Sequence, residues 1–249
     1  MCDRPGAVLV GASAGVGRAL CEELALRGYD LVVSARHAED LDALAANLRL
    51  RHAVAVTARP LDLCGPPEEI ERYVDECFAV LPRIDAVLAT AGAVDEDDDG
   101  TAPPTVATTL LQTNFLGVAS LASAFVERFE TQGRGTIVLF SSVAAAAPRG
   151  RNVVYGAAKA ALEHYGRSLQ HRFAGRNVRV QIYALGYVDT AMAAGRRLLL
   201  PRADPQRIAR AVVDGLDRDR RFAYLPRYWR AVVFVLRRLP WPIYRRLAF

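Results

Sequence analysis

Short apolar runs alternate with amphipathic stretches along most of the chain. The runs are rich in Val, Leu and Ile, which predicts buried strands, and the stretches between them carry apolar residues at helical spacing. The predicted strands are 7–10, 31–33, 53–57, 86–89, 136–140, 178–183 and 222–225. The predicted helices are 16–27, 41–50, 68–81, 105–129, 153–173 and 205–216. Continuously apolar strands need cover on both faces, so we expect an α/β fold with a doubly wound, mostly parallel sheet of seven strands.

A glycine-rich turn, GASAGVG at 11–17, joins the first predicted strand to the first predicted helix. Such a turn lets the backbone approach a pyrophosphate, and the helix N-terminus supplies amide donors and a favourable dipole. The spacing is GxxxGxG rather than GxGxxG, and a tight turn without a ligand is the alternative interpretation. Its position on the first strand favours a single-domain Rossmann fold. The expected cofactor contacts are Gly11, Ser13, Gly15, Val16 and Gly17.

The second predicted strand is followed by Ala35 and Arg36. A cofactor with a free ribose 2′-hydroxyl prefers a carboxylate at this place, and a 2′-phosphate prefers an arginine. This favours NADP(H), with NAD(H) as the alternative, although an arginine here can also be an ordinary surface residue. Asp62, after the third strand, can accept a hydrogen bond from the adenine amino group or serve as an acid at a helix N-terminus.

Ser142, Tyr155 and Lys159 form the sharpest chemical pattern. Ser142 follows the fifth predicted strand at its carboxyl end, where open α/β sheets bind ligands. Tyr155 and Lys159 are four residues apart on a predicted helix and share one face. An ammonium beside a phenol favours the phenolate, which brings the tyrosine nearer to a working pH as a proton donor. The serine hydroxyl can hold the substrate oxygen.

Two further residues support this pattern. Of the 32 basic residues, only Lys159 is a lysine, as expected of a position that needs a compact ammonium rather than a guanidinium. Asn114 lies in the middle of a predicted helix although asparagine is a poor helix former. We expect it to bend that helix and to hold a water molecule beside Lys159.

The chain resembles the short-chain dehydrogenase/reductase family over roughly residues 7–192. The matching pieces are the turn at 11–17, Asp62-Leu63, Thr90-Ala91-Gly92, Asn114, Ser141-Ser142 and the run YGAAK at 155–159. The resemblance implies a nicotinamide-dependent oxidoreductase with the catalytic tetrad Asn114, Ser142, Tyr155 and Lys159. It also implies cofactor contacts at Leu63, Ala91 and Gly92, at Tyr155 and Lys159 themselves, and at Gly186, Val188 and Thr190 near the carboxamide.

The chain departs from the family pattern at three places. Val10 stands where a threonine is usual, Thr90 where the family has asparagine, and Leu185 where it has proline. These departures put the local geometry of the loops in question and leave the reaction class unchanged.

The positive charge is concentrated near the C-terminus. Residues 220–249 contain eight arginines and no acid, so the preceding 219 residues sum to −3. That argues against a nucleic-acid-binding face on the main domain. The four cysteines form no CxxC pair, which indicates no metal site and a cytoplasmic, reducing location. The acidic stretch 94–104 is expected to be a solvated loop.

We expect a catalytic domain over 1–226 and a basic amphipathic tail over 227–249. Arg227, Arg230, Arg237 and Arg238 fall within about 100° on a helical wheel, opposite most of the apolar residues. The apolar run is too short to span a bilayer, which needs about 20 residues. The helix can lie on the inner face of the membrane as a peripheral anchor, or it can pack on the body or a sister subunit.

The run RNVVYG at 151–156, together with the tail, is similar to the decaprenylphosphoryl 2-keto-ribose reductases. This implies reduction of a polyprenyl-phosphate-linked 2-keto-pentose, a carbohydrate step in cell-envelope synthesis. Reduction of ketoacyl thioesters or small ketones is the alternative. A non-catalytic nucleotide sensor on the same fold is a third hypothesis, which the intact Ser142, Tyr155 and Lys159 disfavour. The family resemblance also implies a homodimer or homotetramer.

Overall fold

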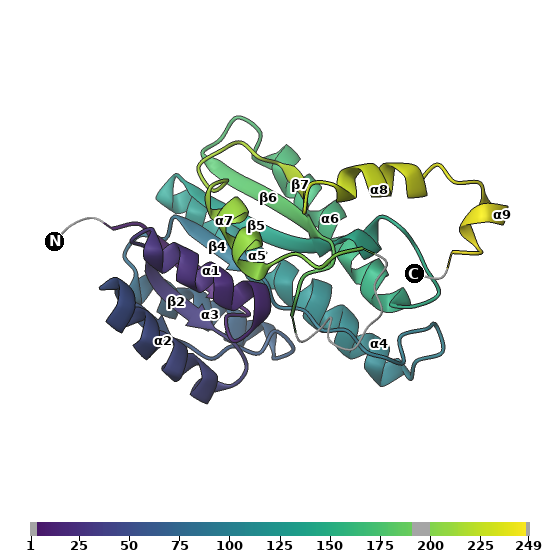
Figure 1. Ribbon diagram of the computed structural model, residues 1–249. Helices are drawn as coiled ribbons and strands as arrows, with labels where there is room; N and C mark the ends of the chain where they lie inside the picture. The colour runs from purple at the N-terminus through teal and green to yellow at the C-terminus, as the bar shows by residue number, and fades with distance from the viewer. Residues whose placement is uncertain (1–3, 191–199, 248–249) are drawn as a thin grey trace.

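The computed structural model describes residues 4–190 and 200–247. Its centre is a parallel sheet of seven strands in the order β3-β2-β1-β4-β5-β6-β7, which confirms the predicted doubly wound Rossmann architecture (Figure 1). The strands are β1 (Gly6–Val10), β2 (Asp30–Ser34), β3 (Val56–Ala58), β4 (Ala86–Ala89), β5 (Gly135–Ser142), β6 (Val178–Leu185) and β7 (Phe222–Leu225). The strand order reverses between β1 and β4, and open sheets of this kind bind ligands outside the carboxyl ends of the strands at that point.

Helices cover both faces of the sheet. One face packs against α1 (Gly15–Leu26), α2 (Ala38–His52) and α7 (Pro205–Val213). The other packs against α3 (Pro67–Val80), α5 (Gly117–Gln132) and α6 (Val153–Arg172). Because both faces are covered, the strands are continuously apolar rather than alternating, which is the pattern read from the sequence.

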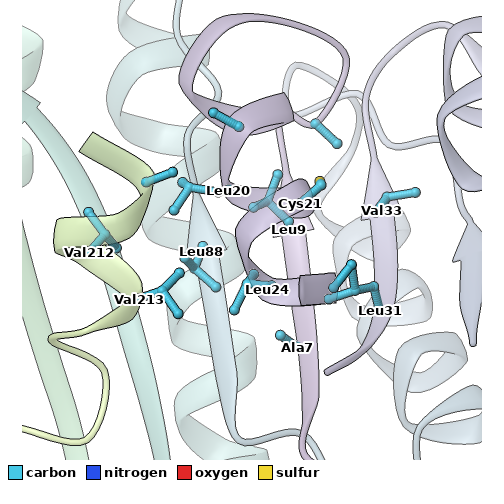
Figure 2. Close-up of a cluster of buried hydrophobic side chains, with 14 of the residues drawn as sticks. Ala7, Leu9, Leu20, Cys21, Leu24, Leu31, Val33, Leu88, Val212 and Val213 are labelled. Carbon is cyan, nitrogen blue, oxygen red and sulfur yellow. The ribbon is translucent and has the colours of Figure 1, made fainter. Parts of the chain in front are cut away.

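Figure 2 shows the core on the first of these faces. Leu20 and Leu24 of α1 are fully buried beside Leu9 of β1 and Leu88 of β4, and Val212 of α7 closes the cluster. Each fully buried leucine or valine stabilises the fold by about 1.5–3 kcal/mol. This packing fixes α1, and therefore the glycine-rich turn at its N-terminus, against the strands of the switch point.

The third strand begins later than predicted. Residues 53–57 were expected to be extended, but the helix before them runs to His52 and ends with Ala53 in the left-handed conformation, at φ 52°. β3 therefore covers only Val56–Ala58. The apolar residues here alternate too briefly to reveal from sequence where the helix stops.

The predicted helix at 105–129 is three pieces. These are α4 (Pro104–Leu111), a π-helical turn (Gln112–Leu116) and α5. Asn114 lies inside the π-helical turn, as the expected helix distortion requires, and such turns often mark functional sites. The whole stretch Pro104–Gln132 is long and apolar enough to cross a membrane, with a mean hydropathy of 1.3. Its α5 portion buries Phe125 and Phe129 against the sheet, however, so it is a core helix.

The acidic stretch is not simply a solvated loop. Asp95, Asp97 and Asp99 are accessible, but the side chain of Asp98 is only 1% exposed and accepts hydrogen bonds from the first turn of α6. The expectation of a uniformly solvated acidic loop is therefore wrong for Asp98, which is buried while its acidic neighbours are accessible.

The tail leaves β7 and forms α8 (Trp229–Leu236) and α9 (Trp241–Tyr244), which extend beyond the β7 side of the sheet (Figure 1). Trp229 and Val233 are buried and pack on Ala146. Nε of Arg237 donates to the Ala146 carbonyl at 3.2 Å, and the Tyr244 hydroxyl donates to the carbonyl of Pro148. The tail is therefore docked on the body, in accordance with the packing interpretation.

The outer face of the tail stays apolar and basic. Phe234 and Val235 are each 56% exposed, and Trp241 and Ile243 are 68% and 52% exposed. Phe234 interrupts the basic arc of the helical wheel, and the structure shows the Arg238 guanidinium 3.5 Å from the centroid of its ring. Docking of one face thus leaves a second face for which the described residues provide no cover.

Candidate active site

A cavity of about 1240 Å³ opens at the carboxyl edge of the sheet. Pockets for drug-sized ligands measure about 300–1,000 Å³, so this larger cavity can hold a dinucleotide together with a second molecule. It brings together residues from the ends of β1 and β5, from the loops after β2, β3 and β4, from α1 and α6, and from the segment after β6. The predicted site residues that line it are Gly11, Ser13, Gly15, Val16, Gly17, Arg36, Asp62, Leu63, Ala91, Gly92, Ser142, Tyr155, Lys159, Gly186, Val188 and Thr190. Asn114 is fully buried behind this wall.

The glycine-rich turn has the shape that a pyrophosphate site needs. Gly11 adopts φ +94°, and a Cβ there would stand 2.6 Å from the amide nitrogen of Ala91. A Cβ on Gly17 would stand 1.9 Å from the Gly11 carbonyl oxygen, so no other residue fits at either place. No side chain of the described residues caps α1 at Ala14, and the first turn contains no acid. Its amides are therefore left for an anion, which fits a dinucleotide phosphate.

Thr90 compensates for its departure from the family pattern. Its hydroxyl contacts the Val10 carbonyl at 3.0 Å and the Gly11 carbonyl at 3.1 Å. A side chain at the end of β4 thus holds the end of β1 and the glycine turn in place. The contact ties the loop after β4 to the glycine turn, which is the local geometry that the threonine-for-asparagine change had put in question.

The adenosine end of the cavity lies between β2 and the loop after β3. Ala35 is buried, whereas Arg36 and His37 are exposed at the wall of the cavity. Asp62 is turned toward its own loop, with Oδ1 accepting from the Cys64 amide at 2.9 Å. Asp62 lies several residues before α3, so it does not act at the N-terminus of that helix. It remains available at the cavity wall for a cofactor contact.

Lys159 is a buried cation beside the tyrosine. It is 4% exposed, and Nζ donates to the Phe140 carbonyl at 3.1 Å and lies 5.8 Å from the Tyr155 ring centroid. Burial lowers the pKa of Lys159 from 10.5 to about 8, because the charged form loses its hydration. The ammonium is thus still charged at neutral pH, close enough to the phenol to favour its anion.

Ser142 ends β5 at the wall of the cavity. Its Oγ accepts a hydrogen bond from the Ala144 amide at 3.2 Å, which leaves the hydroxyl proton for a ligand. The adjacent Ser141 is buried, and its hydroxyl donates to Glu163 at 2.8 Å. Both serines line the cavity, but their hydroxyls differ: that of Ser141 is used by Glu163 of α6, and that of Ser142 is not.

Asn114 reaches the active site through the backbone next to it. Its Nδ2 donates to the carbonyls of Ala93 at 2.8 Å and Leu110 at 3.0 Å, and its Oδ1 accepts from the Ala93 amide at 3.2 Å. A Cβ on Gly92 would stand 3.0 Å from Asn114 Oδ1 and 3.5 Å from Lys159 Nζ. Asparagine and lysine thus face the same small space beside Gly92, where the expected water molecule would lie.

The segment after β6 forms the remaining wall, supported by the tail. Val188 pairs with Ala203, and Thr190 approaches the glycine turn, since a Cβ on Gly15 would stand 2.9 Å from its Cγ2. A Cβ on Gly186 would stand 1.8 Å from Trp229 Nε1. Glycine is thus required at 186 because the tail tryptophan packs directly against it.

Sequence reasoning missed the wall opposite the cofactor turn. This part of the lining contains Arg149 and Arg151, together with four residues of the acidic loop, namely Asp95, Glu96, Asp97 and Asp99. Nε of Arg149 is buried and has no hydrogen-bond partner among residues 4–190 and 200–247. The PRGR run that holds both arginines reads as a plain surface turn, so only its position beside the cavity reveals it. Within the described ranges, no group of three or more His, Cys, Asp or Glu side chains could hold a metal ion.

Comparisons with known proteins agree with this geometry. Residues 6–198 match the family model described as short chain dehydrogenase. An uncharacterized oxidoreductase of Mycobacterium tuberculosis is 30% identical over 243 residues, covering 96% of each chain. The very-long-chain 3-oxoacyl-CoA reductase of Podospora anserina is 28% identical over 92% of this chain and 68% of its own length.

A solved structure of similar sequence also has this fold. A short-chain dehydrogenase of Sphingobium yanoikuyae, in complex with NADPH, is 29% identical, covers 93% of both chains and has a TM-score of 0.82. The family match covers most of this chain, including the glycine turn and the Tyr155–Lys159 pair. The chain therefore belongs to the short-chain dehydrogenase family and is an NAD(P)-dependent oxidoreductase.

Proposed function

We propose that this protein reduces the keto group of a polyprenyl-phosphate-linked 2-keto-pentose, with NADPH, to give the arabinose donor for cell-envelope glycans. The observation that carries the proposal is the cavity wall away from the glycine turn, which contains both arginines and carboxylates and lies beside a basic, apolar tail. The proposal extends the family activity to one substrate class.

The catalytic residues would act on the carbonyl oxygen. Bound nicotinamide supplies the hydride. The Ser142 hydroxyl, whose oxygen is already occupied by the Ala144 amide, donates to the substrate oxygen and holds it. Tyr155 donates the proton that the developing alkoxide needs. Lys159 favours the resulting phenolate electrostatically, and Asn114 fixes the Ala93 backbone beside it.

We propose NADP(H) rather than NAD(H) as the preferred cofactor. Arg36 is exposed at the carboxyl end of β2, where a 2′-phosphate would lie, and Ala35 provides no carboxylate for a free 2′-hydroxyl. The NADPH complex of the Sphingobium enzyme supports the choice.

The substrate end suits a polyhydroxylated anion. Carboxylates accept hydrogen bonds from sugar hydroxyls, and a guanidinium binds a phosphate as a bidentate donor. Arg149 offers an Nε donor that no described residue uses, and the acidic loop supplies carboxylates along the same wall. A fatty-acyl thioester would need an apolar wall here, although the similarity to the 3-oxoacyl-CoA reductase makes it the second candidate.

The tail would hold the enzyme at the membrane that carries such a lipid. Its docked face is used by Trp229 and Val233, while Trp241 and Ile243 remain exposed among arginines. Each arginine near an anionic surface contributes about 1 kcal/mol, an effect that salt weakens. We therefore propose reversible contact with the cytoplasmic face of the membrane, by a homodimer or homotetramer.

Substrate profiling tests the function. The purified full chain is assayed with NADPH and NADH against the decaprenyl-phosphate-linked 2-keto-pentose, 3-ketoacyl thioesters and small ketones. We expect the highest kcat/KM for the lipid-linked sugar, and Arg149→Ala should lower kcat/KM for that substrate while leaving small ketones unaffected. A higher kcat/KM for the thioesters would overturn the proposed substrate.

Vesicle sedimentation tests the membrane contact. The full chain is mixed with phosphatidylglycerol or phosphatidylcholine vesicles, alongside a double variant with Trp241→Ser and Ile243→Ser that leaves α8 docked. Leu50→Ser, which changes an apolar side chain 87% exposed on α2, is the matched control. We expect the control to sediment like wild type with anionic vesicles and the double variant to stay in solution. Equal sedimentation of all three proteins would refute a role for α9.

A further inference from the structure

Asp98 is the buried member of the acidic loop. Its side chain is 1% exposed, although four of its neighbours in the run line the cavity wall. A carboxylate is almost never fully buried unless it is paired or hydrogen-bonded, so the hydrogen-bond partners of Asp98 explain why it is buried.

Those partners are successive amides at the start of α6. Asp98 Oδ1 accepts from the Val154 amide at 2.8 Å, and Oδ2 accepts from the Tyr155 amide at 2.9 Å. The Asp98 carbonyl also accepts from the Val153 amide at 3.3 Å. One residue, distant in sequence, thus satisfies three of the donors that a helix N-terminus leaves open.

The helix does not provide this cap itself. Asn152 occupies the N-cap position in the left-handed conformation, at φ 56°, and its side chain makes no capping hydrogen bond with any described residue. Charged acceptors at a helix N-terminus bind its amides and favour its dipole. Asp98 therefore replaces the missing local cap and anchors the turn that contains the catalytic tyrosine.

The rest of the loop is shaped to hold Asp98 inward. Asp95 accepts from the Asp97 amide at 2.9 Å, and Asp99 accepts from the Thr101 amide at 2.9 Å and the Thr101 hydroxyl at 2.6 Å. Asp95 and Asp99 thus each use one carboxylate oxygen in hydrogen bonds that shape the loop itself. The loop thus has one face on the cavity and one on α6, which connects the substrate wall to the tyrosine backbone.

We propose that Asp98 is a positioning residue for Tyr155, holding its backbone amide so that the phenol meets the substrate oxygen. This rests on Tyr155 being the proton donor of the proposed function. A displacement of about 1 Å in a reacting group can reduce the rate about 10²-fold. The carboxylate should thus influence kcat while leaving the distant adenosine and pyrophosphate contacts intact.

The test compares Asp98→Ala and Asp98→Asn with wild type in steady-state reduction and in NADPH titration. Asparagine keeps one acceptor oxygen, so it should restore part of the loss. We expect kcat to fall about 10- to 100-fold in Asp98→Ala and less in Asp98→Asn, following the cost of misplacing a catalytic group. The dissociation constant for NADPH should change by no more than about twofold, since the adenosine and pyrophosphate contacts lie elsewhere.

Asp204→Asn is the matched control. Asp204 caps α7 from the N-cap position of that helix, accepting from the Gln206 amide at 3.0 Å, and does not line the cavity. It should leave kcat unchanged and lower Tm only slightly, because asparagine caps a helix about as well as aspartate. If Asp98→Ala does not fold, Asp98→Asn alone decides the matter, by its kcat at a temperature where it stays folded.

The outcomes separate the two proposals. A normal kcat in the Asp98 variants, with an inactive Tyr155→Phe, would show Asp98 to be a structural cap only and overturn the inference. An active Tyr155→Phe would instead refute the proposed catalytic role of the tyrosine. Low kcat in the Asp98 variants and normal kcat in Asp204→Asn support the positioning role.

Discussion

Replacing Lys159 by methionine should remove activity and change how stability depends on pH. The ammonium is buried, and its pKa is lowered from 10.5 to about 8. One pKa unit corresponds to about 1.4 kcal/mol, so burying the charged form costs the folded state roughly 3 kcal/mol. This cost is the free energy that Lys159→Met removes.

The sign follows from proton binding. Between about pH 8 and pH 10.5 the unfolded chain holds the lysine proton and the folded chain has lost it, so the stability of the wild type rises with pH. Below about pH 8 both states are charged and the cost is present in full. Methionine does not titrate, so the variant lacks this rise. Loss of the donor to Phe140 costs about 1–3 kcal/mol at every pH.

Urea unfolding of both proteins without cofactor, at several pH values from 7 to 10, measures the effect. We expect the stability of the variant relative to wild type to fall by about 2–3 kcal/mol across this range, the part of the linkage that lies inside it. Arg210→Met, at an exposed position on α7, serves as a control and should show no such trend. A relative stability of Lys159→Met that does not vary with pH would refute the reasoning.

Three further predictions follow from the site. Tyr155→Phe should keep NADPH affinity and lose at least about tenfold in kcat, since positioned acids contribute about 10²–10⁴-fold, and steady-state kinetics with an NADPH titration checks both values. Arg36→Ala should weaken NADPH binding and leave NADH binding unchanged, and equal effects on both cofactors would contradict the assignment. Gly186→Ala would place a Cβ 1.8 Å from Trp229 Nε1, so it should undock the tail and shift tryptophan emission to longer wavelength. An unchanged emission spectrum would contradict that packing.

The sheet was predictable because its strands are buried on both faces. Runs such as Leu31 to Val33 contain only apolar residues, and no competing interpretation fits their length between helices. The ends of elements were less predictable. The helix before Ala53 ends because Ala53 adopts a left-handed backbone conformation, and an alanine in the sequence does not predict that conformation. The π-helical turn has one more residue per hydrogen-bonded turn than an α-helix, and the poor helix former Asn114 was its single indication in the sequence.

The candidate site was predictable where motif and chemistry coincide, as for Tyr155 and Lys159. Asp98 was hidden because five consecutive acids look alike in sequence, and only the fold shows which of them meets amides more than 50 residues away. Arg149 was hidden for the same physical reason. A charged side chain in a loop is ordinarily solvated, and its place beside a cavity depends on long-range packing.

The parallel arrangement of the strands determines which end of the chain tolerates additions. The chain enters β1 at Gly6 on the amino edge of the sheet and leaves β7 at Leu225 on the carboxyl edge, where the ligands bind. A tag, reporter or partner domain fused before β1 thus emerges at the amino edge of the sheet, opposite the edge where the cavity opens. The same addition after α9 would sit near the Arg149 part of the cavity wall, because the Tyr244 hydroxyl donates to the carbonyl of Pro148. Purification and imaging of this enzyme should accordingly use N-terminal fusions.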